Sequence, residues 1–120
     1  MARTSRRVAL VATGGLSHWP GEAHHGKINV EFDEQFLDRL INGDRTKLAD
    51  YSHQEIAREA GSGGHEIRTW IALAGAVPDW EATLLVYEPV VPWATGYAVV
   101  ALPLKSIVDR IRPELFSSGR

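Results

Sequence analysis

The sequence predicts an α/β domain in which a small sheet is covered by helices. Residues 8–13 form a continuous β-branched and aliphatic run that ends at Gly14-Gly15, a pattern typical of a strand buried on both faces. Three helical patterns follow this run, and two further strand-like runs come after them. Three strands are few for a sheet covered on both faces. We therefore expect either a small sheet or one that another chain completes.

The first two predicted helices span residues 31–42 and 52–60. In the first, apolar side chains recur at helical spacing, and Gly43 follows as a stop signal. The second begins with Ser52 and Glu55, which have the spacing of a capping box.

The second half of the chain holds one more helical pattern and the two further strands. Residues 65–77 follow a glycine-rich break, carry apolar side chains around most of the helix circumference and end at Pro78. This pattern predicts a largely buried helix. Residues 83–87 and 96–102 are predicted strands, and residues 105–116 are expected to form a loose C-terminal helix.

Composition excludes several classes of function. The chain has 120 residues, enough for one domain, with a formal net charge of −2 that does not favour a nucleic-acid or membrane-surface partner. It contains no cysteine, which excludes disulfides, thiol nucleophiles and cysteine-ligated metals. A metal would need His, Asp or Glu ligands, which suit Fe(II), Mn or a catalytic Zn. The apolar runs are too short to cross a bilayer, so we expect a cytoplasmic protein.

His18 is the first candidate for chemistry. It closes the stretch GGLSH, directly after the first predicted strand. Ligands of open α/β sheets bind at the carboxyl ends of strands, and a histidine there can act as a general acid or base. The alternative is that His18 only caps a turn. A hydrolase triad built on Ser17 and His18 is disfavoured, because no G-x-S-x-G motif is present.

Glu66 is the second candidate. It follows the stretch GSGGH at the start of the third predicted helix. A carboxylate in a first turn is favoured by the helix dipole alone, which is the structural alternative. This helix is apolar around much of its circumference, however, and a buried carboxylate needs a partner, such as a metal.

The remaining polar candidates are weaker. His24 and His25 are adjacent in a predicted loop, so their side chains do not easily converge on one metal. His53 is expected to face solvent in the first turn of its helix, and Asp33 and Asp38 are expected on the polar face of theirs.

Taken in order, four segments of the chain resemble the catalytic (β) subunits of class III extradiol ring-cleavage dioxygenases, the family of protocatechuate 4,5-dioxygenase. The segments are VALVATGGLSHWPGE, INVEFDEQFLDRLINGD, SHQEIAREAGSGGHEIRTWIALAGA and YEPVVPWATGYAVVAL. The specific part is GGLSH followed by GGHEIRTW, with His18 and Glu66 lying 48 positions apart (66 − 18). Residues 1–104 are taken as the family-like domain, and residues 105–120 as an unmatched tail.

The resemblance implies Fe(II) chemistry. Enzymes of this family hold Fe(II) with two histidines and one glutamate, and they use O2 to open a catechol-type ring. Glu66 matches the iron-binding glutamate, and His18 matches a histidine outside the metal's ligand shell that moves protons. The two iron-binding histidines of the family have no counterpart here, because the resemblance covers only its C-terminal part. A homo-oligomer, or a partner chain that supplies two histidines, is therefore expected.

Two readings of function follow. In the first, the chain is part of an extradiol dioxygenase, and the side chains of His18 and Glu66 face one cleft about 5–10 Å apart, the width of a metal and its substrate. In the second, the chain is a non-catalytic α/β module that acts as a structural or regulatory partner. Both readings leave an uncovered apolar face and an unpaired strand edge, which favour association.

Overall fold

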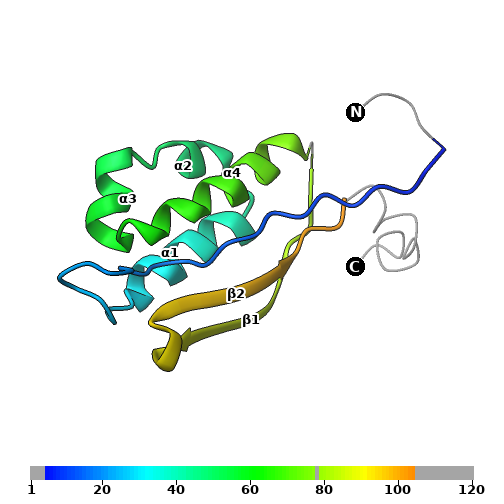
Figure 1. Ribbon diagram of the computed structural model, residues 1–120. Coiled ribbons are helices and arrows are strands. Elements are labelled where there is room, and N and C mark those ends of the chain that lie inside the picture. Colours follow the sequence, from blue (N-terminus) through cyan, green and yellow to red (C-terminus); the bar gives the residue numbers. More distant parts are fainter. Residues whose placement is uncertain (1–4, 78, 105–120) are drawn as a thin grey trace, which may run out of the picture.

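In the computed structural model, which describes residues 5–77 and 79–104, a layer of helices lies against a two-stranded hairpin (Figure 1). The described elements are α1 (Val30–Ile41), α2 (Arg45–Ala49), α3 (His53–Ala60), the 3-10 turn η1 (Gly63–Glu66), α4 (Ile67–Ala76), β1 (Thr83–Val90), the 3-10 turn η2 (Val91–Trp93) and β2 (Thr95–Ala101). Pro78, the helix expected over residues 105–116 and the tail of residues 105–120 lie outside the described residues.

The first two predicted helices are confirmed as α1 and α3. The side chain of Asn29 caps α1 by accepting a hydrogen bond from the Phe32 N–H at 3.1 Å. The Ser52 hydroxyl caps α3 in the same way, accepting from the Glu55 N–H at 3.0 Å. Helix α2 has no counterpart in the prediction, because its five residues carry too short a pattern to show a period.

The third predicted helix forms, but it is not largely buried as expected. Its first turn is the separate 3-10 turn η1, and in α4 only Ile67, Trp70 and Ala74 are buried. Leu73 is half-buried and faces a groove rather than a packed core. The prediction was wrong because an apolar helix surface shows only that its side chains could be buried. Whether they are buried depends on the neighbouring elements, and the described elements cover only part of this helix.

The predicted three-stranded sheet is also corrected, because residues 8–13 do not form a strand. The described sheet has two antiparallel strands, with Thr83 opposite Ala101 and Val90 opposite Thr95. Residues 8–13, here called the apolar segment, are extended, but no strand among the described residues pairs with them. A strand needs a neighbour for its N–H and C=O groups, and residues 5–77 and 79–104 place none beside this segment. The fold is therefore mixed α and β, with a smaller sheet than expected.

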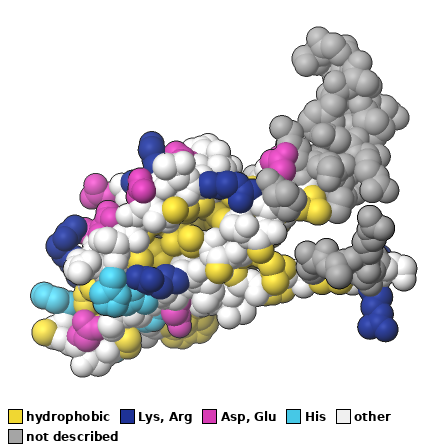
Figure 2. Space-filling view, turned by 90° about the horizontal axis from the view of Figure 1, so that it is seen from above, with side chains coloured by type: hydrophobic (Ala, Val, Ile, Leu, Met, Phe, Trp, Pro, Cys, Tyr) yellow, Lys and Arg dark blue, Asp and Glu magenta, His cyan; other side chains and the backbone are white. Residues whose placement is uncertain are grey.

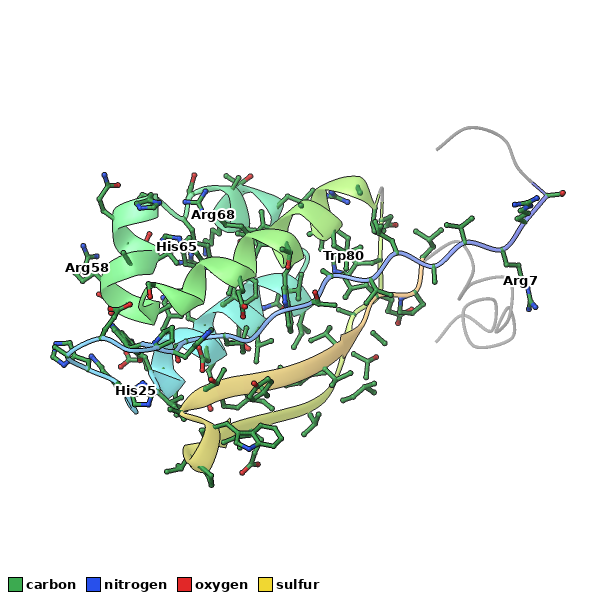
Figure 3. The ribbon with its side chains drawn as sticks, in the orientation of Figure 1. Arg7, His25, Arg58, His65, Arg68 and Trp80 are labelled. Carbon is green, nitrogen blue, oxygen red and sulfur yellow. The ribbon has the colours of Figure 1, made fainter. Side chains whose placement is uncertain are left out.

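The core lies within the helical layer. Its most deeply buried side chains come from every helix and from the loops beside them, and they include Phe36, Leu40, Leu48, Ile56 and Ile67. Trp80, which follows α4, closes one end, and its indole N–H donates to the Leu40 carbonyl at 3.0 Å (Figure 3). The buried core is thus built mainly from the helical layer, and Tyr87, Ala98 and Val100 of the hairpin pack against it.

An apolar groove separates the helical layer from β2, and the apolar segment runs along it (Figure 1). The groove encloses about 210 Å³ and is lined by Val11, Ala12, Leu40, Trp70, Leu73, Ala98, Val99, Val100 and Leu102. Seen from above, the side of the helical layer shows hydrophobic side chains gathered between charged ones (Figure 2). Among the described residues, no helix is long and apolar enough to cross a membrane.

Candidate active site

Four consecutive residues, 15–18, are each fixed by a different element of the fold. We call them the anchor segment. Their backbone N–H groups donate in order to Glu66 Oε2, the Gly96 carbonyl, Asp33 Oδ1 and the Ala60 carbonyl, at 2.6, 2.8, 2.8 and 2.9 Å. These acceptors belong to η1, β2, α1 and α3. The anchor segment is therefore the point where helices and hairpin meet, although it belongs to neither.

The anchor segment brings His18 and Glu66 together. His18 Nε2 lies 3.9 Å from Glu66 Oε2, closer than the 5–10 Å expected. The other ring nitrogen, Nδ1, lies 2.8 Å from the Leu16 carbonyl oxygen. Because a carbonyl oxygen only accepts hydrogen bonds, Nδ1 carries a proton, and Nε2 is the ring nitrogen that faces Glu66.

Glycines make this close approach feasible. A side chain at Gly63 would collide with the His18 ring, and one at Gly14 would place its Cβ 2.7 Å from the Glu66 Cβ. Gly14 also has a φ of +118°, a conformation that L-residues rarely adopt. The glycines in GGLSH and GSGGHE therefore let the two stretches pack against each other.

Asp33 is the functional candidate that the sequence analysis missed. It was expected on the polar face of its helix, yet its side chain is 0% exposed. Its carboxylate accepts hydrogen bonds from the Ser17 N–H, the Ser17 hydroxyl and the Tyr87 hydroxyl, at 2.8, 3.0 and 2.7 Å. The signal was present, because Asp33 lies three and four positions before the apolar Phe36 and Leu37 and so shares their face.

Burial changes the ionisation of this group. It raises the pKa of the Asp33 carboxyl, an effect that the hydrogen bonds from Tyr87 and Ser17 and the charge of His18 oppose. Burial and the hydrogen bond to Asp33 also raise the pKa of Tyr87, so its hydroxyl keeps its proton and remains a donor.

The arrangement is not a hydrolase triad. Ser17 is 0% exposed, and its hydroxyl donates directly to Asp33 and accepts from the Asn29 N–H at 2.8 Å. The His18 Nδ1 is held by a backbone carbonyl, so no imidazole relays between serine and carboxylate.

The described residues offer only part of a metal site. Glu66 is about half exposed (49%), so a metal could reach its carboxylate. No group of three His, Asp or Glu side chains in residues 5–77 and 79–104 is arranged to hold a metal ion. Of the predicted pair, Glu66 can serve as one ligand, and His18 lies beside it.

The other histidines lie apart from this pair. His24 and His25 are exposed on the loop that follows the anchor segment, and His25 accepts from the Gly21 N–H at 3.1 Å. His53 and His65 stack on each other on the helical layer, with ring centroids 4.4 Å apart. Figure 3 shows His25 and His65 on opposite sides of the blue N-terminal part of the chain.

Residues 1–99 match the family described as the catalytic LigB subunit of aromatic ring-opening dioxygenase. The chain belongs to this family. Two 2,3-dihydroxyphenylpropionate/2,3-dihydroxicinnamic acid 1,2-dioxygenases are each 34% identical to it, one from Dechloromonas aromatica (86% of this chain, 34% of the relative) and one from Xanthobacter autotrophicus (83% and 33%). A third, from Paraburkholderia xenovorans, is 36% identical over 77% of this chain and 30% of the relative.

The LigB match confirms the resemblance seen in the sequence motifs, and it includes both His18 and Glu66. The chain spans about a third of the length of the curated relatives it matches. Membership of a family of ring-opening oxidoreductases is thus established for this segment, while the roles of its residues remain predictions.

Proposed function

We propose that the chain contributes part of the active site of an Fe(II)-dependent enzyme that opens catechol-type aromatic rings with O2. Glu66 is one iron ligand and His18 is the acid/base residue. The observation that carries the proposal is the facing pair His18 Nε2 and Glu66 Oε2, 3.9 Å apart on segments 48 positions apart in the sequence.

The electronic environment of His18 supports a proton-transfer role. Because its Nδ1 proton is held by the Leu16 carbonyl, Nε2 is the ring nitrogen that faces the carboxylate, and in the neutral ring it is the nitrogen that can accept a proton. A substrate hydroxyl placed beside Glu66 would lie within reach of this nitrogen, which would take its proton and return it later. The ring is mostly buried, with 16% of its side chain exposed, so its orientation is fixed before substrate arrives.

Glu66 fits the part of an iron ligand, but it cannot form the site alone. A facial triad has three protein ligands and leaves positions open for substrate and O2, and the iron when bound supplies the redox chemistry of ring opening. The described residues contribute one carboxylate to such a site. We infer that two histidines come from elsewhere, either from a partner chain, which includes a second copy of this chain, or from a longer protein of which this sequence is a piece.

Two substitutions test the assignment in the assembled enzyme. Glu66→Ala should abolish iron retention, measured by metal analysis after gel filtration. His18→Ala should retain the iron and lower turnover by about 10²–10⁴-fold, the usual effect of losing an acid/base group. Glu34→Ala and His25→Ala are matched controls, because both side chains are exposed and lie outside the pair.

The opposite pattern would overturn the proposal. Iron loss in His18→Ala would make His18 a ligand, and full activity in Glu66→Ala would remove Glu66 from the site. Absence of ring opening after two suitable histidines are supplied would favour the alternative, a non-catalytic α/β module.

A further inference from the structure

The buried carboxylate of Asp33 plays no part in the proposed chemistry, although burying a carboxylate destabilises the folded state unless donors surround it. A carboxylate removed from water is stable only when donors replace its hydration, and an apolar side chain of similar size would avoid this requirement. Asp33 meets it with two donors from Ser17 and one from Tyr87. Its position therefore calls for a function other than filling the core.

We propose that Asp33 is the positioning residue of the candidate site, whose carboxylate fixes the anchor segment so that His18 and Glu66 face each other. The importance of this geometry for catalysis rests on the proposed function. The positioning itself rests on the hydrogen bonds alone.

The path from Asp33 to the site is short. Asp33 holds both the backbone N–H and the hydroxyl of Ser17, the residue between Leu16 and His18. The Leu16 carbonyl fixes the His18 ring, and the neighbouring Gly15 N–H fixes the Glu66 carboxylate at 2.6 Å. A shift of Ser17 would thus displace both functional side chains at once.

The hairpin is built to accommodate the carboxylate. Gly96 in β2 packs so closely against Asp33 that a Cβ at this position would collide with Oδ2. Tyr87 from β1 donates to the same oxygen, and the Gly96 N–H donates to the Ser17 carbonyl at 3.1 Å. Helix α1 and both strands therefore converge on the anchor segment through Asp33.

The test compares amide hydrogen exchange and the His18 ring state in the full chain. In Asp33→Ala, the amides of residues 15–18 should exchange roughly 10- to 100-fold faster, as expected for loss of hydrogen bonds to a charged group. Amides within α3 should change much less. The ¹⁵N signals of His18 should change from a fixed Nδ1–H form to an average of both tautomers. Asp33→Asn should give an intermediate result, because its amide oxygen can still accept from the Ser17 N–H.

Leu48→Ala is the matched control, since Leu48 is equally buried but belongs to α2. It should lower global stability and leave the His18 tautomer unchanged. If Asp33→Ala behaves like Leu48→Ala, with a uniform effect and an unchanged tautomer, Asp33 is only a stabilising residue and the proposal is wrong. Should Asp33→Ala fail to fold, Asp33→Asn and Tyr87→Phe decide in the same way. None of these readouts needs iron or substrate, so an inactive assembled enzyme would overturn the proposed function and leave this inference standing.

Discussion

Two neighbouring parts of one stretch of chain, the apolar segment (residues 8–13) and the anchor segment (residues 15–18), behave in opposite ways. In the anchor segment, every backbone N–H has an acceptor from a different element. In the apolar segment, Val11 is 76% exposed and Val8 and Leu10 are each more than half exposed. The anchor segment is held in place by hydrogen bonds. The apolar segment, whose sequence predicts a strand most strongly, has no strand beside it among the described residues.

The difference shows what this chain specifies by itself. The geometry of His18 and Glu66 depends on contacts within the described residues, so it is formed in advance of any partner. A strand depends on its neighbours for hydrogen bonds, so the apolar segment and the groove beside it need a further polypeptide surface to be covered. Under the proposed function, we expect that surface to belong to the polypeptide that supplies the two histidine ligands.

The largest expected effect is at Gly14, where the two segments meet. Gly14→Ala combines a left-handed φ of +118° with a Cβ that would lie 2.7 Å from the Glu66 Cβ. Backbone strain and overpacking together should lower the free energy of unfolding by about 2–5 kcal/mol, measured by urea denaturation. Gly26→Ala is the control, because Gly26 also has a positive φ but has open space where the Cβ would lie. Equal losses in both variants would show that the contact with Glu66 is unimportant.

A smaller effect is expected from Tyr87→Phe, which removes one donor to Asp33. Hydrogen bonds to charged groups contribute about 1.5–3 kcal/mol, and the free energy of unfolding should fall by that amount. Tyr97→Phe, on the neighbouring strand and 41% exposed, should change it by less than about 0.5 kcal/mol. If the two variants are equally stable, the network around Asp33 does not hold the anchor segment.

A pH dependence of the same network follows from the raised pKa of Asp33. The folded state binds this proton more tightly than the unfolded state, so folding is favoured as pH falls from neutral through the folded pKa toward the unfolded value of 3.8. Over that window the wild-type chain should gain stability relative to Asp33→Asn, which has no such proton. Parallel denaturation curves from pH 7 to pH 4 measure the difference in the free energy of unfolding. A wild-type chain that loses stability relative to Asp33→Asn over this range would contradict the prediction.

The smallest effect on folding is expected in the apolar segment. Val11→Ala should change the free energy of unfolding by less than about 0.5 kcal/mol, because the side chain is mostly exposed in the chain alone. Val11→Asp should leave folding similarly unaffected but weaken association through the groove, measured by sedimentation with and without the completing polypeptide. A strong loss of stability in Val11→Ala would mean that the segment is already packed.

The local elements could be predicted from the sequence, whereas their burial could not. Caps and periodicity located α1 and α3 to within one residue at each end, because these signals act within a few turns of helix. The strand at residues 8–13 and the buried third helix were predicted from apolar runs alone. An apolar run shows which side chains could be buried. The described residues provide no surface that buries these.

The sequence also predicted only part of the candidate site. The motifs named His18 and Glu66 as candidates, and the structure places the two side chains next to each other. The glycines in those motifs leave the room that this close approach needs. Asp33 was missed because its acidic side chain was assigned to solvent without regard to its face of the helix. Its partners, Ser17 and Tyr87, lie 16 and 54 positions away, beyond the reach of any local pattern.

An anaerobic Fe(II) titration of the chain of residues 1–120 tests the central claim most directly. The claim is that the described residues hold one preformed part of the proposed iron site and that the other ligands come from elsewhere. The chain alone should bind Fe(II) too weakly to survive gel filtration, since a single glutamate with a neighbouring histidine is a poor site. Addition of a polypeptide with two suitable histidines should produce stoichiometric binding that Glu66→Ala abolishes. Tight binding by the chain alone, with catechol ring opening, would contradict the account and make His24, His25 or His65 a ligand.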